Sequence, residues 1–276
     1  MKKVRIEKPL NFDITQTFDC GQCFRFNKAG ENTYEGVALG KYIKVEQSEN
    51  SITFYNTDAS EFENIWSNYF DFNTDYAGII NSFKDDRTLK TAAEYSSGIR
   101  ILRQDMWETL CSFIISQNNN IPRIKGIIER MSEKYGEIVW KDGDKKYYSF
   151  PDAKTLLDAG EKEIFDLKTG FRAKYIFDCA NTICSQPFFL TDVNNLSTPE
   201  ASLHLQKIKG VGAKVAACTL LFGYARHDAF PVDVWVKRIL EKYYPDGENG
   251  HLTGKYAGIA QQYLFYYERC SNGVFL

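Results

Sequence analysis

The stretch that decides the fold is "LQKIKGVGAKVAACTLLFGYARHDAFPVDVWVKRIL", residues 205–240. The apolar spacing predicts a helix that ends at Lys209, a tight turn at Gly210-Val211-Gly212, and a second helix directly after it. Backbone N–H groups at the start of a helix can bind a phosphate without reading a base. A P-loop is excluded because the G-x-x-x-x-G-K-[ST] spacing is absent. An ordinary helix–glycine–helix connection stays open as an alternative.

Two ionisable residues follow the turn. Lys214 falls in the first turn of the second predicted helix, where the helix dipole disfavours an ammonium group. Cys218 and Phe222 continue its face of that helix, so partial desolvation there favours a neutral, nucleophilic amine. Asp233 directly precedes a further predicted helix, and backbone N–H groups at that position stabilise a carboxylate. A surface lysine and a plain N-cap aspartate are the simpler interpretation of each residue alone.

The charge of the chain is unevenly distributed. The net charge is −2, which taken alone argues against a nucleic-acid partner. Residues 46–86 hold nine acidic residues and one basic residue, whereas residues 201–240 hold six basic and two acidic ones. A basic face can therefore exist within a nearly neutral total. The sequence has no apolar run of membrane-spanning length and no signal peptide at its start, so we expect an intracellular protein.

The chain divides into two predicted parts, and the fold class expected is α+β. Residues 1–97 are β-rich, with a hairpin over residues 43–54 and a helix around Phe62–Phe70 packed on it. In residues 98–276 the apolar spacing becomes helical, starting with a helix that contains Trp107 and Ile115. Further helices are predicted over residues 121–135, 152–168, 173–185, 199–208, 213–224, 234–243 and 255–268.

These blocks together resemble one known family. "GVGAKVAAC" followed by "PVDVW" resembles the helix–hairpin–helix, Gly/Pro-Asp signature of base-excision DNA glycosylases, with the hairpin over about residues 199–224. "GIRILRQDMWETLCSFIISQNNNIPRI", "TGFRAKY" and "GIAQQYLF" narrow the resemblance to the 8-oxoguanine DNA glycosylases. The fold implied is an antiparallel, TATA-binding-protein-like β domain followed by a helical domain that carries the active site. The partner implied is double-stranded DNA containing 8-oxoguanine.

The resemblance also implies roles for individual residues. Lys214 would be the nucleophile that displaces the base, giving a Schiff base and then β-elimination, and Asp233 would stabilise the developing positive charge on the sugar. The damaged base must leave the stack to be reached. Gln261 would read its Watson–Crick edge, and Phe265 and Cys218 would sandwich its ring.

The segment "FDCGQCFRF" at residues 18–26 raises a separate question, because Cys20-Gly21-Gln22-Cys23 is a C-x-x-C motif. In the family it resembles, the carbonyl of the glycine at position 21 accepts from the N7–H that distinguishes 8-oxoguanine from guanine. We therefore expect incidental thiols, with a redox pair as the alternative. A zinc site is not expected, because a second C-x-x-C or a histidine pair is missing. The iron–sulfur loop of some related glycosylases is missing as well, because Cys270 stands alone, so no metal or other cofactor is expected.

A further group would hold the opposite strand. The resemblance assigns to Asn118, Arg123, Phe171 and Arg172 the filling of the duplex gap and the binding of the orphaned cytosine, and Gly210-Val211-Gly212 would bind backbone phosphate. An aromatic wedge such as Phe171 needs no hydroxyl.

The sequence departs from the family pattern at two positions. Trp235 stands where a phosphate-binding histidine is common, and Glu268 stands where an aspartate pairs with it. Those two roles are therefore not transferred to this chain.

Several alternatives remain at this point. A non-catalytic DNA-binding module would need only the hairpin, and a thiol oxidoreductase would use Cys20 and Cys23. A sister glycosylase for alkylated bases is disfavoured because those enzymes do not generally use the lysine. We expect a monomer without a protein partner, located in the cytoplasm and, in a bacterium, associated with the nucleoid.

Overall fold

The structure, a computed structural model, describes residues 2–247 and 250–271. Its first part contains a five-stranded antiparallel sheet in the order β1-β5-β4-β3-β2. The predicted hairpin is confirmed, since Val45 of β4 lies opposite Phe54 of β5. The strands are β1 (Lys3–Glu7), β2 (Phe26–Gly30), β3 (Thr33–Ala38), β4 (Lys41–Gln47) and β5 (Ser51–Tyr55).

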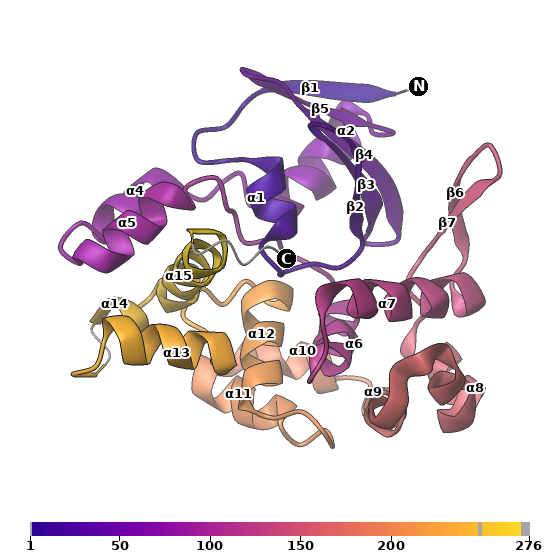
Figure 1. The fold of residues 1–276 in the computed structure, drawn as a ribbon. Helices are drawn as coiled ribbons and strands as arrows, with labels where there is room; N and C mark the ends of the chain where they lie inside the picture. Colours follow the sequence, from indigo (N-terminus) through magenta and orange to yellow (C-terminus); the bar gives the residue numbers. More distant parts are fainter. Residues whose placement is uncertain (1, 248–249, 272–276) are drawn as a thin grey trace.

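Short helices cover one face of this sheet (Figure 1). Ile14 and Phe18 of α1 and Trp66 of η1 pack with Ile43 and Phe54 from the sheet in one buried apolar cluster. Burial of these large side chains is the main force that holds the helices on the sheet. The helices of this part are α1 (Ile14–Asp19), α2 (Ala59–Glu61), η1 (Phe62–Trp66), α3 (Ser67–Tyr69), α4 (Tyr76–Ser82) and α5 (Arg87–Tyr95).

The second part is mainly helical, as predicted. α7, α9 and α13 have the predicted bounds, but α11 ends at Leu205 and not at Lys209. Leu205 and Ile208 are both buried, so the apolar spacing continues through a turn after the helix has ended. The helices are α6 (Met106–Ser116), α7 (Ile121–Tyr135), α8 (Ala153–Ile164), η2 (Phe165–Thr169), η3 (Gly170–Arg172), α9 (Ala173–Ser185), α10 (Phe189–Asp192), η4 (Val193–Asn195), α11 (Thr198–Leu205), α12 (Ala213–Gly223), α13 (Val234–Tyr243), α14 (Gly250–Thr253) and α15 (Ala257–Ser271).

A β-hairpin interrupts the helical part and was not predicted. It consists of β6 (Ile138–Asp142) and β7 (Lys145–Tyr148) and projects from between α7 and α8 (Figure 1). Trp140 stacks on Tyr42 of the large sheet with ring centroids 5.5 Å apart, and the Tyr147 hydroxyl donates to Glu35 at 2.7 Å. The second part is therefore not entirely helical, although the α+β class is confirmed.

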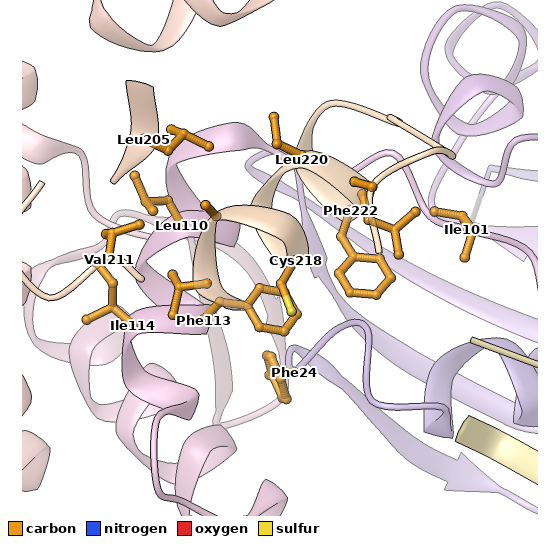
Figure 2. Packing of buried hydrophobic residues seen from close by; sticks show 14 of the residues in the cluster. Phe24, Ile101, Leu110, Phe113, Ile114, Leu205, Val211, Cys218, Leu220 and Phe222 are labelled. Carbon is orange, nitrogen blue, oxygen red and sulfur yellow. The ribbon is translucent and has the colours of Figure 1, made fainter. Parts of the chain in front are cut away.

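The buried side chains form two main clusters. The smaller lies under the sheet, and the larger surrounds α12 and includes Leu205, Leu110 and Leu220 (Figure 2). α4 and α5 contribute their buried side chains to the larger cluster, although both lie before the predicted boundary at residue 97. In the described ranges, no helix has the length and apolarity needed to cross a bilayer.

Candidate active site

Lys214 lies where α12 packs against α6. It is the second residue of α12, and its Nζ donates to Ser116 Oγ at 3.2 Å. The amine also lies 5.1 Å from the ring centroid of Phe113. The ring beside the amine therefore belongs to α6, whereas the sequence pointed to Phe222 on the same helix. The amine is thus half-buried between a hydroxyl and an aromatic ring.

Asp233 is the N-cap of α13, as predicted. Its backbone is extended, and its carboxylate accepts from the backbone N–H of Val236 at 2.9 Å. The positive end of the α13 dipole and this hydrogen bond both stabilise a negative charge. Asp233 lines the same pocket as Lys214, so the site combines a primary amine with a carboxylate held at a helix end.

One pocket brings together all six residues predicted to act on the damaged nucleotide. Its neutral walls come from three separate parts of the chain: α12, α15 and the loop after α1. Burial raises the pKa of the Cys218 thiol to about 11, so that side chain stays protonated and serves as an uncharged wall. The six residues are Gly21, Lys214, Cys218, Asp233, Gln261 and Phe265.

Two buried glutamines hold the Cys20–Cys23 loop in the pocket wall. Gln22 is fully buried, donates to the carbonyls of Thr17 and Arg100 at 2.8 Å each, and accepts from the Leu102 N–H at 2.8 Å. Gln262 of α15 donates to the Cys20 carbonyl at 2.8 Å. The backbone of Gly21 is thereby fixed between the sheet part and α15.

The two thiols of this loop are packing groups. Cys20 belongs to the larger apolar cluster and Cys23 to the smaller one, so each anchors one end of the loop in a different core. Burial raises the pKa of Cys20 to about 12 and that of Cys23 still further. A reactive thiol needs the opposite shift, which argues against a redox pair.

We expect Cys20→Ser with Cys23→Ser to retain excision of 8-oxoguanine under reducing conditions. A serine hydroxyl can donate to the carbonyls of Thr17 and Phe18, which the thiols contact in this structure. The measurement is single-turnover excision, with thermal unfolding as a check on folding. A folded but inactive double variant would show that the thiols take part in the chemistry.

Gly21→Ala should impair excision. Gly21 has a φ of +87°, which costs an L-residue about 1–2 kcal/mol. The added methyl group would also face Phe265 at 3.8 Å, on the side where the base is expected. Gly40→Ala is the matched control, because Gly40 has a φ of +70° in open space. Equal excision by the two variants at equal stability would remove Gly21 from base recognition.

The helix–hairpin–helix turn leaves the start of α12 exposed. Gly210 has a φ of +84°, and a Cβ there would lie 2.3 Å from the ring of Tyr175, so only glycine fits. Val211 is buried, while Gly212 is the exposed N-cap of α12 with no side-chain cap. The first N–H groups of α12 are therefore available to a phosphate.

The predicted opposite-strand residues gather around the end of α6, but one of them is placed differently from expectation. Asn118 and Arg123 are exposed, and Phe171 is half-exposed. Arg172 is only 2% exposed, and its guanidinium donates to the carbonyls of Gln117, Asn118 and Thr169.

Arg123 is therefore exposed, whereas most N–H groups of the Arg172 guanidinium are used within the chain. Arg172 supports Asn118, whose φ of +47° is unusual for a residue other than glycine. Burial and the nearby charge of Arg123 lower the pKa of Arg172, so the two cations lie close to each other.

Trp235 and Glu268 replace the histidine–aspartate pair of the family in this sequence. Trp235 lines the outer part of the site, and Arg238 lies over its ring at 5.4 Å. Glu268 instead accepts from Lys242 at 2.9 Å and from the Tyr243 hydroxyl at 2.8 Å.

Five residues of the site were not singled out in the sequence, although Gln22 lies within the quoted C-x-x-C. Polar residues within otherwise apolar blocks were the available signal for Gln22, Ser116 and Gln262. No sequence signal pointed to Phe113, because it falls outside the predicted apolar face of α6. The fifth residue, Arg269, stands one turn after Phe265 on α15.

The fold and the site are those of a broad class of DNA repair proteins, within which a particular family can then be identified. The model of the HhH-GPD superfamily of base excision DNA repair proteins matches residues 111–254. The model of the 8-oxoguanine DNA glycosylase N-terminal domain matches residues 5–110. The chain belongs to the 8-oxoguanine DNA glycosylase family.

Individual relatives agree with this assignment. The N-glycosylase/DNA lyase OGG1 of Arabidopsis thaliana is 31% identical over 275 residues, which cover 90% of this chain and 75% of that protein. The structure of MBOgg1 with a low-affinity DNA ligand has 40% identity and a TM-score of 0.92, covering 99% of this chain and 97% of that one. The Clostridium acetobutylicum 8-oxoguanine glycosylase/lyase, bound to double-stranded DNA with cytosine opposite 8-oxoguanine, has 39% identity and a TM-score of 0.90, covering 98% of each chain.

Proposed function

We propose that the protein excises 8-oxoguanine from double-stranded DNA by attack of the Lys214 amine on C1′ of the damaged nucleotide, and then cleaves the strand by β-elimination. Glycosylase and lyase activity as such follow from the family. The observation that carries the specific mechanism is the shared pocket of Lys214 and Asp233, with neutral walls beside them.

The chemistry assigns one task to each of these two groups. The lone pair of Nζ forms a bond to C1′ while the C1′–N9 bond breaks, and the departing base takes the bonding pair and a proton. The sugar carries positive charge in this step, which the Asp233 carboxylate stabilises. The amine supplies both protons of this sequence: one leaves with the base, and the other passes to O4′ as the C1′–O4′ bond breaks, which gives the Schiff base. Removal of a C2′ proton then expels the 3′ phosphate.

Recognition of the lesion is assigned to Gly21 and Gln261. The N7–H of 8-oxoguanine donates to the Gly21 carbonyl, whereas the N7 of guanine is an acceptor and is repelled. Gln261 is buried in the pocket and can pair with the Watson–Crick edge of the flipped base. Phe265 and Cys218 would enclose the ring of the base.

The preference for cytosine is assigned mainly to Arg123. Arg123→Ala should narrow the ratio of excision opposite cytosine to excision opposite adenine, because a lost base contact costs about 1–3 kcal/mol of discrimination. Arg172→Ala should lower excision opposite all bases and lower the melting temperature, since Arg172 holds Gln117 and Asn118. A uniform loss for Arg123→Ala, with a reduced salt dependence, would reassign that residue to the phosphate backbone.

A panel of duplexes tests the proposed function. Single-turnover base release and strand cleavage are measured for 8-oxoguanine, guanine and 3-methyladenine, each opposite the four bases. We expect release of 8-oxoguanine, fastest opposite cytosine, followed by cleavage on its 3′ side. Release of 3-methyladenine alone would show that the protein is a glycosylase for alkylated bases. Binding to the duplexes without release of any base would show that it is a non-catalytic DNA-binding module.

A further inference from the structure

Arg269 lies at the mouth of the pocket that holds Lys214, outside the base-binding part. It lines an outer cavity of about 380 Å³ together with Gly21, Lys214, Asp233 and Trp235, but it does not line the inner pocket. Its guanidinium carbon lies 4.9 Å from the ring centroid of Phe265. The side chain is thus held by a cation–π contact at the place where a flipped nucleotide must pass.

The Arg269 guanidinium has few partners among the described residues. Its Nε is buried and has no hydrogen-bond partner among the described residues. The Arg269 guanidinium also forms no ion pair within the described part of the chain. Burial lowers the pKa of Arg269, while the charge of Asp233 acts in the opposite direction. A partly buried cation without a partner among the described residues is costly, which points to an anion outside the described part of the chain.

Few other basic side chains line the outer cavity and could bind such an anion. Lys214 and Arg269 are the two basic residues among its described lining residues, and Trp235 contributes only an uncharged indole. The amine of Lys214 must be neutral to attack C1′, so it cannot also neutralise a phosphate. A nucleotide whose C1′ reaches Lys214 brings its own phosphate into the outer cavity. Arginine remains charged under all such conditions and binds phosphate through two N–H groups at once.

We propose that Arg269 is a phosphate-binding residue at the pocket mouth, where it holds the sugar–phosphate backbone of the flipped nucleotide through its guanidinium. This inference rests on the proposed function, because it takes Lys214 as the group that the nucleotide reaches. Arg269 thereby supplies the cationic contact that Trp235 cannot make.

Binding to a duplex with a tetrahydrofuran abasic analogue opposite cytosine tests the proposal without any chemistry or damaged base. The full chain is titrated by fluorescence anisotropy over a series of KCl concentrations. Arg269→Gln should weaken binding about tenfold or more at low salt and reduce the slope of log Kd against log salt by about 0.9. Arg269→Lys should keep most of the slope. The charge-matched control is Arg87→Gln, at the exposed start of α5 and outside both cavities, which should match the wild type.

Neutral methylphosphonates placed singly around the abasic analogue identify the phosphate. At one position beside the analogue, the substitution should weaken wild-type binding as much as Arg269→Gln does and should add nothing to that variant. A folded Arg269→Gln protein with the wild-type salt slope would overturn the proposal, and so would additive effects at every position. Failure of the wild type to release 8-oxoguanine would refute the proposed function while leaving this binding result intact.

Discussion

Lys214→Gln should abolish base release and strand cleavage together, each by about three orders of magnitude or more. The two activities are lost together because both depend on the bond between Nζ and C1′. Glutamine can keep a hydrogen bond to Ser116, which the amine contacts at 3.2 Å, but it has no nucleophilic lone pair. Binding to an 8-oxoguanine duplex should change by less than about tenfold. Single-turnover kinetics of both products and anisotropy measure these quantities.

Lys162→Gln is a suitable control for Lys214→Gln. Lys162 is exposed on α8 and lines neither the inner pocket nor the outer cavity, so its removal changes the net charge equally without touching the site. The control should release base at the wild-type rate. Near-normal base release by Lys214→Gln, with only strand cleavage lost, would show that water displaces the base.

Asp233→Asn should reduce the rate of base release by about 10²–10³-fold with little effect on folding. Asparagine is as good an N-cap as aspartate, so the hydrogen bond from Val236 can be kept. What is removed is the negative charge that stabilises the sugar in the transition state, an effect of about 3–4 kcal/mol. The measurement is single-turnover base release together with thermal unfolding.

Asp152→Asn separates capping from catalysis. Asp152 caps α8 in the same way, accepting from Thr155 N–H at 2.7 Å, and it lies outside the pocket. We expect both variants to unfold near the wild-type temperature and only Asp233→Asn to lose activity. Proportional losses of stability and activity for Asp233→Asn would favour a purely structural N-cap.

Local signals explain why much of the fold and site could be predicted. Apolar spacing at 3.6 residues gave the bounds of α7, α9 and α13, since each of these helices buries one face. Lys214 and Asp233 sit beside a glycine turn and a proline, and each occupies the helix end that the sequence implies. Residues whose role is set by a helix terminus can be found this way.

Long-range contacts explain what was missed. The guanidinium of Arg172 donates to the carbonyls of Gln117 and Asn118, which lie more than 50 residues away in the chain. A sequence pattern does not show that these hydrogen bonds occupy its donors. The hairpin of β6 and β7 has short, charged strands that gain their apolar contact from Tyr42 of another sheet. The same limit applies to Arg269, which meets Phe265 locally but faces Gly21 only through the fold.

Trapping with borohydride tests the central claim most directly. The wild-type protein is incubated with an 8-oxoguanine:cytosine duplex in the presence of borohydride, and the crosslinked peptide is identified by mass spectrometry. A Schiff base at Lys214 predicts a stable covalent adduct on the peptide that contains Lys214, and no adduct with Lys214→Gln. Efficient base release without any trapped adduct, or an adduct on a different amine, would contradict the account.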